Sequence, residues 1–110
     1  MTDRFHVKYS KEALDDLRNI YTYIAYQLLA RETAKKLVNK IRSEVRLLSN
    51  FPEKHKKIDW EPWASKHIRR KPVENYIIYY LVHHEQRTIS IVRIIYSARD
   101  VKRLIQENAE

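Results

Sequence analysis

The stretch from residue 75 to residue 82, Asn-Tyr-Ile-Ile-Tyr-Tyr-Leu-Val, constrains the fold of this chain most. Its β-branched and aromatic residues predict a strand, and the side chains of a strand alternate between the two faces of a sheet. Both alternating sets are apolar here: Tyr76, Ile78, Tyr80 and Val82 on one face, and Ile77, Tyr79 and Leu81 on the other. The strand is therefore expected to lie in the middle of a sheet that is covered on both faces.

Two more strands are predicted beside this central one. Residues 88–96 form a near-continuous β-branched run, and residues 67–73 form a basic segment that precedes the central strand. The connections between the three segments are short, and short connections join antiparallel neighbours. We therefore expect an antiparallel meander in the C-terminal half.

Two amphipathic helices are predicted before the meander. Apolar residues recur three or four positions apart over residues 11–29, and again from Ala34 to Leu48. The break between them, near Ala30, is short. The helices should therefore form an antiparallel hairpin that packs on the sheet.

The remaining elements follow from the ends of these helices. Ser10 suits the N-cap of the first helix, and Pro52 ends the second. Residues 5–9 alternate as an edge strand does, and a short last helix is expected after Asp100. The chain is therefore predicted to be an α+β domain of order β-α-α-β-β-β-α, in which the helical hairpin packs on an antiparallel sheet.

Length and composition set the context for this domain. With 110 residues, the chain is expected to be one domain over residues 1–110. No run approaches the about 18 apolar residues of a membrane span, and the N-terminus lacks the apolar core of a signal peptide. Cysteine is absent and the five histidines show no ligand spacing. We expect a cytoplasmic protein with no membrane partner, no metal site and no small-molecule cofactor.

Charge and glycine content restrict the function. The formal net charge is +8, which favours nucleic acid or an acidic protein as partner. Glycine is absent, whereas Walker loops, dinucleotide-binding turns and serine-hydrolase elbows all need it. Any bound phosphate would therefore be held by Lys and Arg side chains.

Several motifs resemble the RelE/ParE family of bacterial toxins over nearly the whole chain. The N-terminal half resembles the ParE branch, in the positions Ala13-Leu14-Asp15-Asp16-Leu17, Ile20, Tyr23-Ile24, Ala34 and Pro52. The C-terminal half has the form that the branches share, in the positions Arg69, Pro72-Val73, Tyr76 to Tyr80, Ile91-Val92-Arg93 and Arg99-Asp100. Each motif is weak alone, but their order and spacing together are specific.

The resemblance implies the toxin of a type II toxin-antitoxin system, which inhibits growth. Its partner would be a cognate acidic antitoxin, a segment of which folds on binding and covers the sheet and the helices. RelE-like members cut mRNA in the ribosomal A site, whereas ParE-like members inhibit DNA gyrase without nuclease activity. We place ribosome-dependent mRNA cleavage first and gyrase inhibition second.

The resemblance also implies candidate catalytic residues. The two basic strand positions of RelE-like enzymes fall on His67 and Arg69, and the arginine after the last strand falls on Arg99. Such cations would stabilise the charged transition state of phosphodiester cleavage. Strand alternation predicts that His67, Arg69 and Lys71 share one face.

Other residues are candidates for binding RNA or another target: Arg70, Lys71, Tyr76 and Tyr96. Two positions depart from the RelE pattern, because Tyr76 replaces an arginine and Ile105 replaces a tyrosine. Either Tyr96 or Tyr76 could supply a phenol instead. A RelE-type site is therefore present only in part.

Three further expectations concern structure. Arg93, in the middle of an apolar strand, should pair with a buried acid. Glu12, Asp15 and Asp16, near the start of a helix, should complement its dipole. Trp60 and Trp63 should cover the edge of a core or dock a partner rather than stack on bases.

Overall fold

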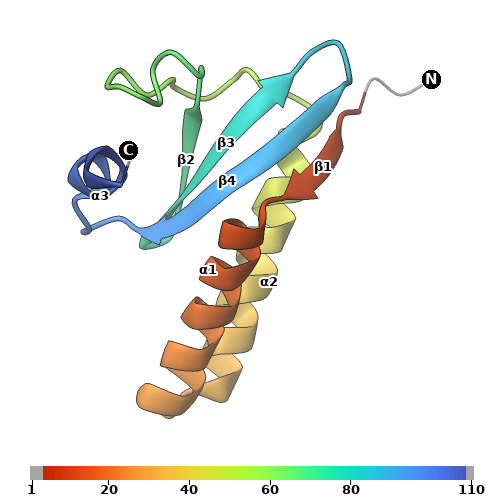
Figure 1. The fold of residues 1–110 in the computed structure, drawn as a ribbon. Coiled ribbons are helices and arrows are strands. Elements are labelled where there is room, and N and C mark those ends of the chain that lie inside the picture. Colours follow the sequence, from red (N-terminus) through yellow and green to blue (C-terminus); the bar gives the residue numbers. More distant parts are fainter. Residues whose placement is uncertain (1–3, 109–110) are drawn as a thin grey trace.

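The computed structural model describes residues 4–108 of the chain. The elements, in order, are β1 (His6–Tyr9), α1 (Lys11–Thr22), the π-helical turn η1 (Tyr23–Gln27), α2 (Arg31–Leu48), β2 (Arg69–Val73), β3 (Tyr76–His83), β4 (Thr88–Tyr96) and α3 (Val101–Glu107) (Figure 1). The predicted order of strands and helices is confirmed. Among the described residues, no helix combines the length and apolar character needed to cross a membrane.

The four strands form one sheet in the order β1-β4-β3-β2. Strands β2, β3 and β4 are antiparallel neighbours, which confirms the meander. The expectation of a wholly antiparallel sheet is wrong for β1, which runs parallel to β4 with His6 opposite Thr88. The alternation within a strand does not specify the direction of its neighbour, and a long connection permits either direction.

Strand β3 lies inside the sheet and is buried on both faces, as predicted. Ile78 and Tyr80 belong to the core between the sheet and the α1–α2 hairpin. Tyr79 belongs to a second core on the opposite face, which includes Trp63 and one side of α3. The Trp63 ring lies 4.8 Å from that of Tyr79, and Trp60 stacks on Trp63 at 5.2 Å. The tryptophans therefore cover a core edge, as expected.

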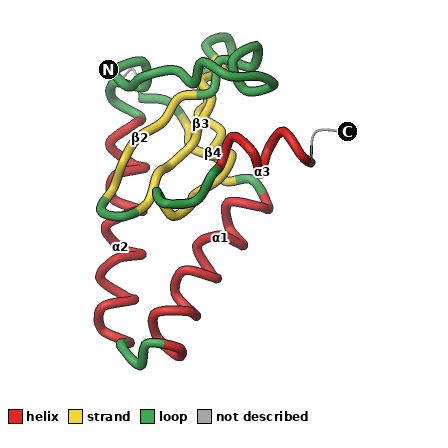
Figure 2. Tube along the Cα trace, turned by 90° about the vertical axis from the view of Figure 1, so that its left-hand side faces the viewer, coloured by secondary structure: helices red, strands yellow, loops and turns green. Residues whose placement is uncertain are grey.

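The helical hairpin is longer than the sheet is wide, so its closed end extends beyond the strands (Figure 2). Ser10 caps α1 as predicted, because its hydroxyl accepts the Ala13 N–H at 2.9 Å. The helix predicted over residues 11–29 is observed as α1, which continues without a break into η1 as far as Gln27, where the Leu28 N–H donates to the Tyr23 carbonyl at 3.1 Å. This i to i+5 bond widens the last turn.

The connection from residue 53 to residue 66 is tied to the sheet by side chains. The Tyr80 hydroxyl donates to the Pro52 carbonyl at 2.7 Å, in a fully buried position. The Arg69 guanidinium donates to the Glu53 and His55 carbonyls at 3.1 and 2.7 Å. These bonds satisfy backbone acceptors that have no strand or helix partner.

Burial raises the pKa of Tyr80 to about 12, above the ordinary value of 10.0. The folded state therefore holds the phenolic proton more tightly than the unfolded chain does. Stability from this difference is fully present below about pH 10 and is lost as the pH rises to about 12. We expect chemical denaturation at a series of pH values to show a fall in this window, and Tyr80→Phe to make that fall shallower. An unchanged slope in Tyr80→Phe would contradict the prediction.

Candidate functional site

A groove of about 1040 Å³ lies between the helical hairpin and the ends of β3 and β4. Its floor is apolar and comes from α1, η1, α2 and β4 (Ile20, Ile24, Leu37 and Ile94). Its polar rim comes from every surrounding element (Asp16, Asn19, Thr33, Lys36, Lys40, Glu74, Asn75 and Arg99). An apolar floor with a few polar groups around it is the usual form of a binding site.

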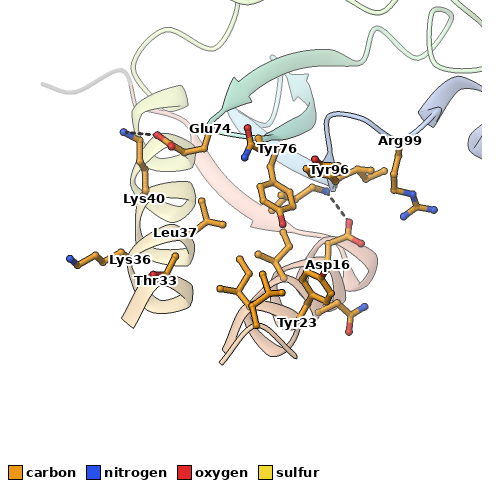
Figure 3. A pocket seen from close by; sticks show the side chains of 17 residues that line it. Asp16, Tyr23, Thr33, Lys36, Leu37, Lys40, Glu74, Tyr76, Tyr96 and Arg99 are labelled. Atoms are coloured by element: carbon orange, nitrogen blue, oxygen red, sulfur yellow. Dashed lines mark hydrogen bonds and ion pairs between the residues drawn. The ribbon is translucent and has the colours of Figure 1, made fainter. Parts of the chain in front are cut away.

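Three tyrosines meet in this groove. Tyr76 and Tyr96 are opposite each other on β3 and β4, and their rings lie 5.7 Å apart at 64°. Tyr23 approaches them from η1 and is half exposed (Figure 3). Burial raises the pKa of Tyr76, with smaller contributions from the phenols of Tyr96 and Tyr23. The Tyr76 phenol therefore stays protonated at neutral pH and can donate a hydrogen bond.

Unpaired cations stand on two sides of the groove. Arg99 lies in the turn after β4, and its N–H donates to the Tyr96 carbonyl at 3.1 Å. In residues 4–108, neither the Arg99 guanidinium nor the Lys36 ammonium has an ion-pair partner. Lys40 is different, because its ammonium lies 3.4 Å from the Glu74 carboxylate. The groove thus offers two available positive charges to an anionic partner.

Asp16 fixes one wall of the groove. Its carboxylate accepts from the Arg93 guanidinium at 2.8 and 3.0 Å, and from the Ile94 N–H at 2.8 Å. The bond to Asp16 is the main cause of the raised pKa of Arg93. The predicted pairing of Arg93 with a buried acid is confirmed. The sequence predicts only a dipole role for Asp16 and not its bond to Arg93. This bond joins α1 to β4 across 77 positions of the sequence.

Three of the predicted site residues come together here. Arg99, Tyr76 and Tyr96 all line the groove, and they come from the turn after β4, from β3 and from β4 (Figure 3). Their spacing in the sequence does not predict that they lie close together, because this depends on the register between β3 and β4. Their roles remain predictions.

The other predicted residues lie elsewhere. At the groove end of β2, Val73 lies opposite Tyr76, whereas Arg69 lies opposite Tyr80. Arg69 is therefore four residues, or about 13 Å along the strand, away from the groove end. The Lys71 ammonium is 3.2 Å from the Glu44 carboxylate. The side chain of Arg70 contacts Tyr79, on the opposite face of the sheet.

The expected placement of His67 is wrong. Strand β2 begins at Arg69, and His67 lies in the preceding turn with a φ of 59°. A positive φ breaks the alternation that would put His67 on the face of Arg69 and Lys71. Residues 66–68 are instead held by bonds to the loop before them, in which the Ile68 N–H donates to the Trp63 carbonyl at 3.2 Å.

The sequence reasoning missed Tyr23 and Lys36 as groove residues. Tyr23 lies outside the apolar stripe of its helix, and an exposed aromatic residue beside such a stripe is a usable signal. Lys36 gives no such signal, because charged residues fill the outer faces of both helices.

The sequence from residue 7 to residue 101 matches the model of a protein family described as "ParE toxin of type II toxin-antitoxin system, parDE". The match therefore spans most of the chain and includes the groove. No curated protein sequence matches the chain at a significant level.

Solved structures have the same fold. A chain of the chromosomal ParDE system from P. aeruginosa superposes with a TM-score of 0.69 and 23% identity, over 86% of this chain and 98% of that one. A chain of the RelBE2 toxin-antitoxin complex from Mycobacterium tuberculosis gives 0.66 and 16%, over 87% and 94%. A chain of the archaeal RelE–RelB complex from Pyrococcus horikoshii OT3 gives 0.60 and 18%, over 87% and 98%. The predicted RelE/ParE-like α+β fold is confirmed.

Proposed function

The chain belongs to the ParE toxin family of type II toxin-antitoxin systems, and from this membership we propose that it stops growth by inhibiting DNA gyrase without cutting RNA. The observation that carries the proposal is the separation of the predicted catalytic cations. Arg99 lies in the groove, whereas Arg69 is bonded to two backbone carbonyls and His67 lies outside the strand. This reverses the order in which the sequence ranks the two targets.

Cleavage of a phosphodiester needs a proton acceptor, a proton donor and cations around one phosphate. The Tyr76 phenol is a poor proton acceptor at neutral pH, because burial raises its pKa and keeps it protonated. The Lys71 ammonium is shared with Glu44, which reduces the positive charge available for a phosphate. The two unpaired cations of the groove, Arg99 and Lys36, beside protonated phenols are better suited to binding than to this chemistry.

The groove has the composition of a protein-binding surface. Its exposed aromatic side chains, Tyr23 and Tyr96, lie beside the unpaired cation of Arg99. Tyrosine and arginine, with tryptophan, are enriched among the residues that contribute most to the affinity of protein interfaces. A target with an acidic surface next to an apolar one would fit this groove.

As a toxin of a type II system, the chain has an antitoxin as its partner. We propose that an acidic, amphipathic segment of the antitoxin occupies the groove. Its apolar side would cover Ile24 and Leu37, and its carboxylates would meet Lys36 and Arg99. The antitoxin would then neutralise the toxin by covering the surface that binds the target.

Ribosome-dependent mRNA cleavage is the second candidate. One observation favours it: the groove gathers Arg99 with two phenols, Tyr76 and Tyr96, which can donate to a phosphate. A ribosome could orient the RNA and lower the demand on the site. The two targets therefore need to be compared with the same protein.

The test uses one purified preparation in two assays. We expect the toxin to inhibit supercoiling by gyrase and to leave mRNA on programmed ribosomes intact, because the cations for cleavage are not assembled. The Arg99→Ala variant should lose the inhibition. Cleaved A-site codons with unaffected supercoiling would overturn the proposal and establish the second candidate.

A further inference from the structure

Two basic segments lie side by side at the β2 edge of the sheet, far along the strand from the groove. Lys57 is bridged to Arg69 in antiparallel pairing. The Arg70 N–H donates to the Lys56 carbonyl at 2.9 Å, and the Ile58 N–H donates to the Ile68 carbonyl at 2.8 Å. Residues 54–57 (Lys-His-Lys-Lys) thereby lie against residues 66–71 (Lys-His-Ile-Arg-Arg-Lys).

The pairing of these two segments places like charges opposite each other. In this register Lys56 faces Arg70, so two cations lie directly across from each other on one face. Like charges in such positions destabilise a strand pair. Residues 53–71 carry seven of the 22 Lys and Arg residues and three of the 14 acids, so they hold half of the net charge of +8.

Most of this charge is not neutralised within the fold. In the part of the chain that the structure describes, Lys54, Lys56, Lys57 and Lys66 are exposed and have no ion pair. The only partner seen for the Arg70 side chain there is the neutral Tyr79 phenol. Burial, then the charges of Lys71 and Lys54, lower the pKa of His55, which fits a strong positive potential. We define Lys54, Lys56, Lys57, Lys66 and Arg70 as the basic ladder.

We propose that the basic ladder binds the phosphodiester backbone of nucleic acid. Exposed Lys and Arg side chains bind phosphates without reading sequence and release counterions as they do so. A bound polyanion would also remove the repulsion between Lys56 and Arg70. An acidic protein is a poorer fit, because the exposed residues of the two segments, 54–57 and 66–71, include no apolar side chain.

The ladder is a separate surface from the groove. The groove takes its rim from the helical hairpin, β3 and the turn after β4, and no ladder residue lines it. The inference therefore does not depend on whether gyrase or the ribosome is the target. The test measures nucleic-acid binding directly and does not use growth inhibition as a readout.

The test is fluorescence anisotropy with labelled duplexes of about 20 base pairs, one of DNA and one of RNA, from about 50 to about 200 mM salt. We expect dissociation constants in the micromolar range and a steep salt dependence. The variant K56A/K57A/R70A should bind at least about tenfold more weakly at low salt, and its slope of log K against log salt on DNA should be smaller by about 2 to 3.

A matched variant, K11A/K35A/K102A, removes the same charge from exposed lysines outside the ladder. It should lose much less affinity than the ladder variant does. Equal losses in the two variants, or no binding to either duplex at low salt, would overturn the proposal. A preference for one duplex supports the proposal and identifies the polymer that the ladder binds. Circular dichroism confirms that both variants are folded.

Discussion

Replacing Arg99 with alanine is expected to abolish growth inhibition and to leave the melting temperature almost unchanged. Arg99 is exposed and pairs with no acid among residues 4–108, so its removal should cost about 0.5 kcal/mol of stability or less. A charged hydrogen bond to the target would be worth about 1.5–3 kcal/mol, which is about 10- to 100-fold in affinity. Viable counts after induction, together with thermal melts, measure both effects.

Arg103→Ala is the matched control for this variant. Arg103 is also an exposed arginine near the C-terminus, but it pairs with Glu107 on α3 at 2.9 Å and lies outside the groove. Surface pairs of this kind contribute little to stability. We expect Arg103→Ala to remain fully toxic. Full toxicity of Arg99→Ala with an unchanged melting temperature would remove Arg99 from the site.

Replacing Asp16 with alanine is expected to destabilise the fold by about 3 kcal/mol. The change leaves the half-buried Arg93 without its partner and the Ile94 N–H without its acceptor. A loss of this size should lower the melting temperature of a domain of about 100 residues by about 10 °C or more. Thermal and urea denaturation measure the loss.

The neighbouring residue provides the control. Asp15 carries the same side chain on the same helix, but its pair with Arg18 is on the surface, with side chains 43% and 73% exposed. Asp15→Ala should therefore cost less than about 0.5 kcal/mol. Adding Arg93→Met to Asp16→Ala should restore part of the stability, because the unpaired charge is then gone. Equal effects of Asp15→Ala and Asp16→Ala would contradict the role given to Asp16.

The sequence predicts those parts of the fold that depend on local pattern. The strand around Ile78 is apolar on both faces, so it requires a central position in the sheet. The Ser10 cap follows from the residue type, and the β2–β3–β4 meander follows from the short connections between its strands. The need of Arg93 for a buried acid is also local, since a charge within an apolar strand must be paired.

The parts that depend on distant contacts could not be predicted. The parallel pairing of His6 with Thr88 and the bond between Asp16 and Arg93 join segments about 80 residues apart. Alternation in a sequence can also continue through a turn: the pattern predicts a strand from His67, but the positive φ of His67 places it in the turn before β2. The groove depends on all of these contacts at once, so its residues were found only in part.

The two-sided sheet has a consequence for how this toxin can diverge. The groove belongs to the layer between the helical hairpin and the sheet, whereas the basic ladder lies at the β2 edge, on the connection before β2 and on β2 itself. Substitutions at sites without shared contacts have nearly additive effects. On the roles proposed for the two surfaces, substitutions in the groove would change the antitoxin partner while the ladder stays as it is, so duplicated copies would lose cross-neutralisation through groove substitutions alone.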